Sequence, residues 1–154
     1  MRRATLDDVP VLLGLMAEFY AESGYRLNLD IAEGAFRALI DNPALGSAWI
    51  IEAAEQAAGH LVLTYRIAME YGGLTACVDD LYVRPAWRNG GLATRALRDI
   101  VELCDRTGLR GMTVEVDPTN GPAKTAYHRV GFVPLAGREV LGMTFAPPAH
   151  YPKA

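Results

Sequence analysis

The spacing of hydrophobic positions predicts two helices in the first third of the chain. Over residues 5–24, apolar side chains recur every three or four positions, which gathers them on one face of a helix, and Thr5 or Asp7 can cap its start. A second stretch with the same spacing covers residues 30–40 and ends ahead of Pro43. Two amphipathic helices therefore precede the first clear strand.

From residue 47 the pattern changes to alternating apolar and polar positions, which is typical of strands. Strands are predicted over residues 47–53, 59–70 and 74–83, with Gly72-Gly73 as the turn between the last two. The rest of the chain predicts a helix, a strand, a second helix and a last strand, over residues 91–108, 111–116, 120–130 and 138–145. Because this order combines antiparallel hairpins with strand-helix-strand crossovers, we expect an α/β fold (α+β mixed sheet) whose central, mostly antiparallel sheet has helices on both faces.

Composition and charge limit the class of protein. The 154 residues are 51% hydrophobic, with no repeat or long linker, so we expect a single domain over residues 1–154. A net charge of −3 with interspersed acids and bases leaves no basic surface for a nucleic acid. The sequence has neither an apolar run of the roughly 20 residues that cross a bilayer nor a secretory signal, so we expect a cytoplasmic protein with no membrane partner. Cys77 and Cys104 lie among apolar neighbours without metal-ligand spacing, which indicates buried, reduced thiols and no metal.

The stretch VRPAWRNGGLATRALRDIV, residues 83–101, places glycines and arginines where a strand meets a helix. A helix N-terminus leaves about four N–H groups unpaired and carries about half a positive charge. Gly90 and Gly91 let the backbone approach a ligand, and Arg88 and Arg95 add charge, so an anion site is expected. The glycines alone leave open a second interpretation, in which a turn starts a helix among solvated arginines. The stretch lacks the motifs of nucleoside-triphosphate and dinucleotide loops.

Arg88-x-x-Gly91-x-Ala93 matches the Arg/Gln-x-x-Gly-x-Gly/Ala signature of the GNAT superfamily of acetyl-CoA-dependent N-acetyltransferases, which the chain resembles along nearly its whole length. VDDLYVRPAWR resembles that family's fourth strand and pyrophosphate loop, and VEVDPTNGPAKTAYHRVGF resembles its fifth strand and fourth helix. The fourth-strand motif is most similar to that of the diamine and polyamine acetyltransferase branch. Asn89 departs from the family pattern, in which glycine is common at this position. The departure matters only if the backbone needs a strained angle there.

The resemblance implies acetyl-CoA as co-substrate and assigns its contacts. The pantetheine arm would bond to the backbone of the fourth strand, which splays from the fifth in this family, and the pyrophosphate would rest on the amides of residues 88–94, with the Thr94 hydroxyl as a further donor. Asn120 would contact the cofactor and can also cap its helix. The cofactor-binding residues implied in this way are Leu81, Tyr82, Val83, Arg88, Asn89, Gly90, Gly91, Leu92, Ala93, Thr94, Asn120, Ala123 and Tyr127.

Two residues are expected to handle protons. Tyr127 matches the family's tyrosine that faces the cofactor sulfur and is the expected general acid; without the resemblance, core packing is the ordinary role of such a residue. Asp79 matches the acid that lies near the substrate amine in the diamine and polyamine branch, so it could take the amine's proton, directly or through water. The alternative is that Asp79 and Asp80 are polar groups at a strand end. Strand alternation sends these two side chains to opposite faces.

The acceptor is less well defined by the sequence. Asp79, Asp80, Glu22 and Glu115 are expected around a cationic amine, although acids on a helix face are usually solvated. The amine could belong to a polyamine, an amino acid, an aminoglycoside or a protein. We expect an N-acetyltransferase that forms a homodimer and acetylates a primary amine of a small molecule by direct attack in a ternary complex, without a covalent enzyme intermediate. A non-catalytic acyl-CoA-binding sensor, and an enzyme acting on protein lysine or N-terminal amines, are the alternatives.

Overall fold

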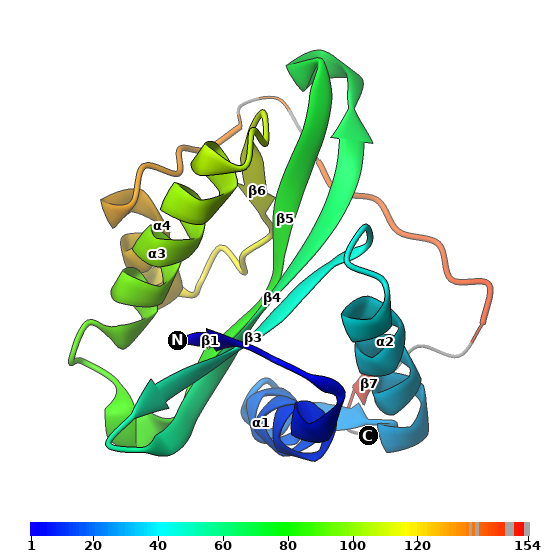
Figure 1. Cartoon of the computed structure of the whole chain (residues 1–154), viewed down its shortest axis with the longest axis vertical. Helices are drawn as coiled ribbons and strands as arrows, with labels where there is room; N and C mark the ends of the chain where they lie inside the picture. The colour runs from blue at the N-terminus through cyan, green and yellow to red at the C-terminus, as the bar shows by residue number, and fades with distance from the viewer. Residues whose placement is uncertain (136, 138, 147–149, 153–154) are drawn as a thin grey trace.

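A mixed sheet forms the centre of the protein (Figure 1). The structure is a computed structural model that describes residues 1–135, 137, 139–146 and 150–152. Within these ranges the strand order is β1-β3-β4-β5-β6, with antiparallel neighbours except for the parallel pair β5–β6. The strands are β1 (Arg2–Arg3), β3 (Gly46–Ala53), β4 (Gln56–Ala68), β5 (Gly73–Val83) and β6 (Met112–Val114). The expected mixed, mostly antiparallel sheet is confirmed.

Helices cover both faces of this sheet, as predicted, and each face has its own core (Figure 1). Alternate residues of β4 divide between the cores: Val62 packs with α1 and α2, whereas Leu61 and Leu63 pack with α3 and α4. None of the helices in the described ranges has the length and apolarity needed to cross a membrane. The helices are α1 (Val9–Glu22), α2 (Leu29–Asp41), α3 (Leu92–Arg106) and α4 (Gly121–Arg129), with short 3₁₀ turns η1 (Leu6–Asp8), η2 (Met69–Tyr71) and η3 (Pro85–Trp87).

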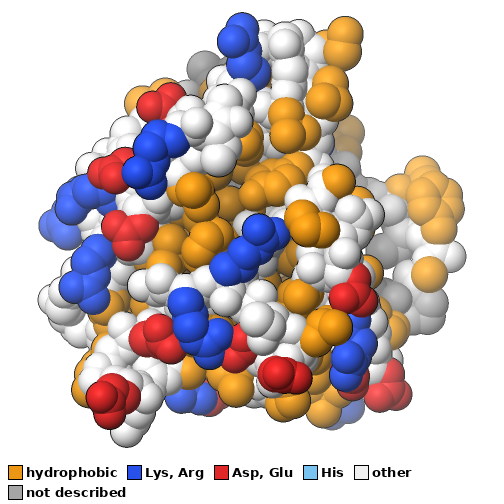
Figure 2. All heavy atoms as spheres, viewed as in Figure 1, with side chains coloured by type: hydrophobic (Ala, Val, Ile, Leu, Met, Phe, Trp, Pro, Cys, Tyr) orange, Lys and Arg blue, Asp and Glu red, His pale blue; other side chains and the backbone are white. Residues whose placement is uncertain are grey.

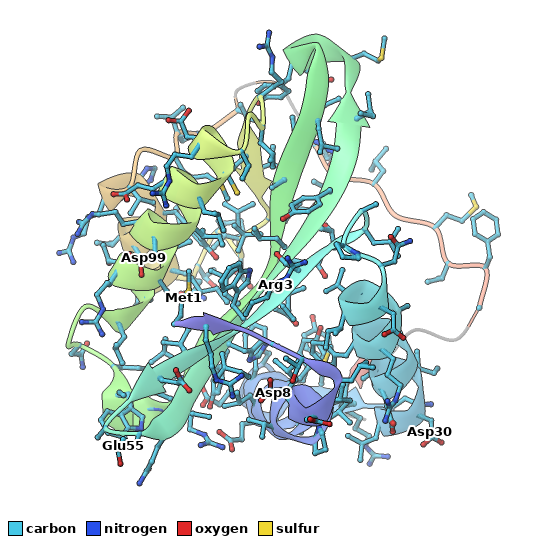
Figure 3. The ribbon with its side chains drawn as sticks, viewed as in Figure 1. Met1, Arg3, Asp8, Asp30, Glu55 and Asp99 are labelled. Atoms are coloured by element: carbon cyan, nitrogen blue, oxygen red, sulfur yellow. The ribbon has the colours of Figure 1, made fainter. Side chains whose placement is uncertain are left out.

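Asp8 ties the start of α1 to the first strand. Arg2 donates to both carboxylate oxygens of Asp8 at 2.7 Å through Nη1 and Nη2, and to Glu52 of β3 at 2.9 Å through Nε. The Thr5 amide and hydroxyl donate to the same carboxylate. Figure 3 shows Asp8 where the N-terminal segment turns into α1. The Arg2 guanidinium and these hydrogen bonds hold the pKa of Asp8 well below its usual range.

Most elements lie where the periodicity predicts them, with boundaries that differ by a few residues. The short strands were not predicted: β1, and the antiparallel pair of β2 (Tyr25–Leu27) with β7 (His150–Pro152), are too brief to show alternation. Both cysteines are free, and the predicted burial holds for Cys104, whereas Cys77 is half-buried.

The predicted last strand, residues 138–145, is wrong over 139–145, which form no strand; Arg138 lies outside the described residues. This segment is β-prone in sequence, but a strand exists only where another strand pairs with it, and the chain here runs away from β6 towards β7 (Figure 1). Apolar side chains on the projecting segment face solvent at the right of Figure 2. The most exposed are Val140 at 68%, Leu141 at 86%, Met143 at 79% and Phe145 at 93%.

Candidate active site

β5 loses its neighbour β6 partway along its length. The parallel ladder ends at the pair Val78–Val114, whereas the pairing of β5 with β4 continues to Val83. On the side of β6, the backbone from Asp79 to Val83 therefore has no strand partner among the residues described. An open edge of this kind can receive an extended ligand as an additional strand.

A β-bulge begins at the same point. Val62 of β4 pairs with Asp80, but the next β4 residue, Leu63, pairs with Val78, so Asp79 is an extra residue in β5. The extra residue interrupts the period of two, and the side chains of Asp79 and Asp80 line one and the same pocket. The prediction that strand alternation sends the two aspartates to opposite faces is therefore wrong.

Asp79 lies within electrostatic reach of two other predicted acids, Asp80 and Glu115. Removal from water raises the pKa of Asp79, and the charges of Asp80 and of Glu115, which lies just beyond β6, raise it further. A carboxylate whose pKa is raised in this way is a better proton acceptor for an amine than a fully solvated one. The arrangement therefore provides concentrated negative charge at the end of the β5–β6 ladder.

The pocket that contains both aspartates lies between the first two helices and the sheet. It has a volume of about 140 Å³. Thr64 joins Asp79 and Asp80 as its polar lining. The rest of the lining is apolar and comes from α1, α2 and β4: Met16, Ala32, Ala35, Phe36, Leu39 and Val62.

His60 was not identified as a functional residue from the sequence. It is fully buried, neither ring nitrogen has a hydrogen-bond partner in the described part of the chain, and Nε2 lies 3.7 Å from Asp80 Oδ2. Phe19 and Tyr82 pack around the ring, with centroid distances of 6.4 and 6.0 Å. Its signal in the sequence was a histidine at an inward position of an otherwise apolar strand, but the neighbouring carboxylate appears only once the β4–β5 register is known.

Tyr127 is a residue of α4 and packs into the core between α3, α4 and the sheet. It is 8% exposed, and its ring packs edge-on against Phe132 at a centroid distance of 5.5 Å. Burial raises the pKa of Tyr127 to about 12, with smaller contributions from the charges of Asp80 and Cys77. The hydroxyl is thus held protonated at neutral pH. Tyr127, the predicted proton donor, is therefore close enough to Asp80 to feel its charge.

The start of α3 has the geometry expected of an anion site. Gly91 precedes the helix with φ of 77°, and a Cβ on it would have no atom within 4 Å, so the glycine serves the backbone conformation and leaves the site open. Asn89 also has a positive φ, 65°, so the strained angle is present, and asparagine is among the residues that tolerate it best. The first helical hydrogen bond runs from the Arg95 amide to the Gly91 carbonyl. The amides of Leu92, Ala93 and Thr94 precede it and therefore have no partner within the helix.

Arg88 and Glu22 are paired with each other in the structure. Arg88 Nε donates to Val83 O and Nη2 donates to Glu22, both at 2.7 Å, and the guanidinium lies 5.5 Å from the centroid of the Tyr82 ring. The Arg88 amide already donates to Pro85 O. Arg88 therefore anchors the loop to α1. Glu22, which also accepts from the Tyr82 hydroxyl at 2.9 Å, belongs to the same anchor.

Asn120 caps α4 as predicted, because its Oδ1 accepts from the Ala123 amide at 3.1 Å. The Ala123 side chain packs against the α3–α4 core. Arg84, which the sequence analysis left out, forms a second anchor of this end of β5 by donating to both oxygens of Glu18, at 2.7 and 2.8 Å.

The mixed sheet with helices on both faces, the open edge of β5 and the glycine turn before α3 are the arrangement of a GNAT acetyltransferase domain. Residues 13–132 match the Acetyltransferase (GNAT) family, so the chain belongs to that family. No curated protein sequence matches it.

Solved structures show the same fold. An integron cassette protein from the mobile metagenome of Cole Harbour Salt Marsh is 42% identical, with a TM-score of 0.86 over 96% of this chain and 91% of that one. A protein from Clostridium acetobutylicum described as a predicted acetyltransferase with acetyl-CoA is 18% identical, with a TM-score of 0.77 over 92% and 94% of the two chains. The aminoglycoside N-acetyltransferase AAC(6')-Iy in complex with CoA is 16% identical, with a TM-score of 0.78 over 94% and 93%.

Proposed function

We propose that this protein transfers the acetyl group of acetyl-CoA to a primary amine of a small molecule by direct attack in a ternary complex. The observation that carries the proposal is the coincidence of three features at one place in β5. The β5–β6 ladder ends there, and a bulge brings Asp79 and Asp80 to the same pocket. The buried Tyr127 lies within electrostatic reach of Asp80. The GNAT membership of the chain and its neighbour with acetyl-CoA support the same assignment.

In this proposal the cofactor lies along the open edge of β5 and its pyrophosphate lies at the start of α3. The backbone of Leu81, Tyr82 and Val83 receives the pantetheine arm, although Val83 O already accepts one bond from Arg88. The amides of residues 89–94, the Thr94 hydroxyl and the side-chain NH₂ of Asn120 are the donors for the rest of the cofactor. Arg88 holds this loop in shape.

The acceptor amine approaches from the pocket and loses a proton before it attacks. Asp79, with its raised pKa, accepts that proton directly or through water, and Asp80 and Glu115 hold the cation in place. Tyr127 donates a hydrogen bond to the thiolate that leaves. A thioester is already activated, so no enzyme nucleophile is needed.

Isothermal titration with acetyl-CoA and CoA, followed by a thiol-release screen over small amines, tests the proposal. Binding of acetyl-CoA followed by thiol release that depends on a small amine is the expected result. Binding without release from any small amine or protein substrate would reject the enzyme in favour of an acyl-CoA sensor. Release with protein lysine or N-terminal amines alone would reject the small-molecule acceptor.

We also propose that the protein is a homodimer. The support is the row of exposed apolar side chains on residues 139–145, since such segments commonly mark interaction surfaces. Sedimentation at micromolar concentration is expected to give twice the chain mass of 16.7 kDa, and a single species of 16.7 kDa would reject the dimer.

A further inference from the structure

The pocket beside β5 also indicates which amines the site takes, if the proposed acetyl transfer is correct. Asp80 is only 8% exposed, and within the described ranges neither of its carboxylate oxygens accepts a hydrogen bond. His60 Nε2, at 3.7 Å, is beyond hydrogen-bonding distance. A mostly buried carboxylate to which no protein group donates a hydrogen bond is stabilised by a cation that enters the pocket.

No lysine or arginine lines the described part of this pocket, so its two carboxylates have no cationic side chain among its walls. The bulge places both Asp79, which is exposed, and Asp80, which is buried, in the lining of this pocket, next to the point where the β5–β6 ladder stops. One ammonium group at this end would therefore face two carboxylates and lie beside the open edge.

The walls of the pocket that face the two carboxylates are mostly apolar. Ala35, Phe36 and Leu39 of α2 and Val62 of β4 are apolar. A second ammonium or a hydroxyl on the acceptor would find no hydrogen-bond partner on these four side chains, so placing it against them costs binding energy. The volume of about 140 Å³ is below the range of about 300–1,000 Å³ typical of pockets for drug-sized ligands.

We propose that the acceptor is a primary monoamine with a compact hydrocarbon body, such as a short alkylamine or a phenylalkylamine, which lies between α2 and β4 with its ammonium against Asp79 and Asp80. This departs from the diamine and polyamine branch that the VDDLYV motif resembles, because the α2 side of the pocket carries no acid for a second cation. The same argument disfavours an aminoglycoside, which carries several ammonium groups and hydroxyls.

The transfer balances with this acceptor. The ammonium gives one proton to Asp79, directly or through water, and the resulting amine attacks the thioester carbonyl carbon. The new C–N bond replaces the C–S bond, the sulfur leaves as a thiolate, and the nitrogen loses its second proton. The products are the N-acetyl amine, protonated CoA thiol and one net proton released to solvent.

The first measurement compares hexylamine with 1,6-diaminohexane at equal ionic strength, since the two differ mainly by a second amine. Thiol release is expected to give hexylamine a kcat/KM at least about tenfold higher, and 2-phenylethylamine should also be turned over. An equal or higher kcat/KM for the diamine, for spermidine or for kanamycin would overturn the inference and leave the proposed acetyl transfer intact. Absence of monoamine turnover by a protein that binds acetyl-CoA would overturn it too. Loss of acetyl-CoA binding would instead reject the proposed function itself.

A matched pair of variants tests the wall of the pocket. Ala35 lines the pocket and is exposed enough to accept a longer side chain, whereas Ala38 is exposed on the same helix and does not line it. Ala35→Glu supplies a carboxylate for a second ammonium, so the preference for hexylamine over 1,6-diaminohexane should fall about tenfold, with the KM for acetyl-CoA unchanged. Ala38→Glu makes the same change of charge and should leave the preference as in the wild type. An equal shift in both variants, or a shift in neither, would contradict the placement of the hydrocarbon body along α2.

Discussion

Replacement of Tyr127 by phenylalanine tests the proton donor of the proposed reaction. The ring is buried against Phe132, and among the described residues its hydroxyl has no hydrogen-bond partner. Tyr127→Phe therefore removes one oxygen atom without breaking a protein hydrogen bond, and the free energy of unfolding should change by less than about 1 kcal/mol. The change in rate can then be assigned to chemistry and not to folding.

The expected size of the effect follows from the pKa of Tyr127, about 12. A thiol has a pKa of about 8.5, so complete transfer of the tyrosine proton to the leaving thiolate would be uphill by about 3.5 pH units, or about 5 kcal/mol. A hydrogen bond to the developing thiolate has no such cost. We therefore expect a loss in kcat of about 10²-fold, at the low end of the range for general acids, which corresponds to about 2.7 kcal/mol.

Thiol release at saturating amine gives kcat, and isothermal titration gives the affinity for acetyl-CoA, which should stay within about twofold of the wild type. Tyr65→Phe is the control, because Tyr65 packs on the same core and its hydroxyl lies 3.4 Å from Ser47 Oγ. An unchanged kcat in Tyr127→Phe would remove the residue from the reaction. A loss above about 10⁴-fold would contradict the argument from the pKa and indicate full proton transfer.

Three further predictions test the anion site, the base and the fold. Gly91→Glu should raise the Kd for acetyl-CoA by about 100-fold or more in calorimetry, because it adds bulk and a like charge at the phosphates. Gly72→Glu changes another positive-φ glycine with open surroundings and should leave the Kd unchanged. Equal losses of affinity in both variants would reject the anion site. Because Asp79 accepts a proton only when ionised and its pKa is raised, kcat should rise with pH through a value above the ordinary aspartate pKa of about 4, and Asp79→Asn should abolish this limb; a limb that persists in the variant belongs to another group. Asp8→Asn should lower the free energy of unfolding by about 2 kcal/mol at pH 7 in urea titrations. The folded-state pKa of Asp8 is depressed, so its contribution is present above pH about 4 and is lost as the pH falls below it; a variant as stable as the wild type at pH 7 would show that the Arg2–Asp8 pair contributes nothing.

Local patterns were sufficient for most of the fold. Helical and strand periods depend on residues three, four or two positions apart, so the main helices and the β3–β4–β5 meander could be predicted without long-range information. The short strands β1 and β2, and the absence of a strand over residues 139–145, depend on which segments meet, and no local pattern carries that information.

The anion site was equally local. Gly91, Asn89 and the first turn of α3 are neighbours in sequence, and their backbone angles follow from residue type and helix geometry. The ion pair of Arg88 could not be predicted from the local sequence. Arg88 lies in the motif, but its partner Glu22 belongs to α1, more than sixty positions earlier.

The sequence by itself determined the helices, the long strands, the anion-binding turn and the family, because each rests on residues close together in the chain. Only the tertiary structure decided what these elements do together. In the β4–β5 register Asp79 is the extra residue of a bulge, so both aspartates line the same pocket. The same register places His60 beside Asp80. The packing of α2 over that pocket gives it apolar walls. Register and packing are relations between segments far apart in sequence, and it is these relations that form the candidate site.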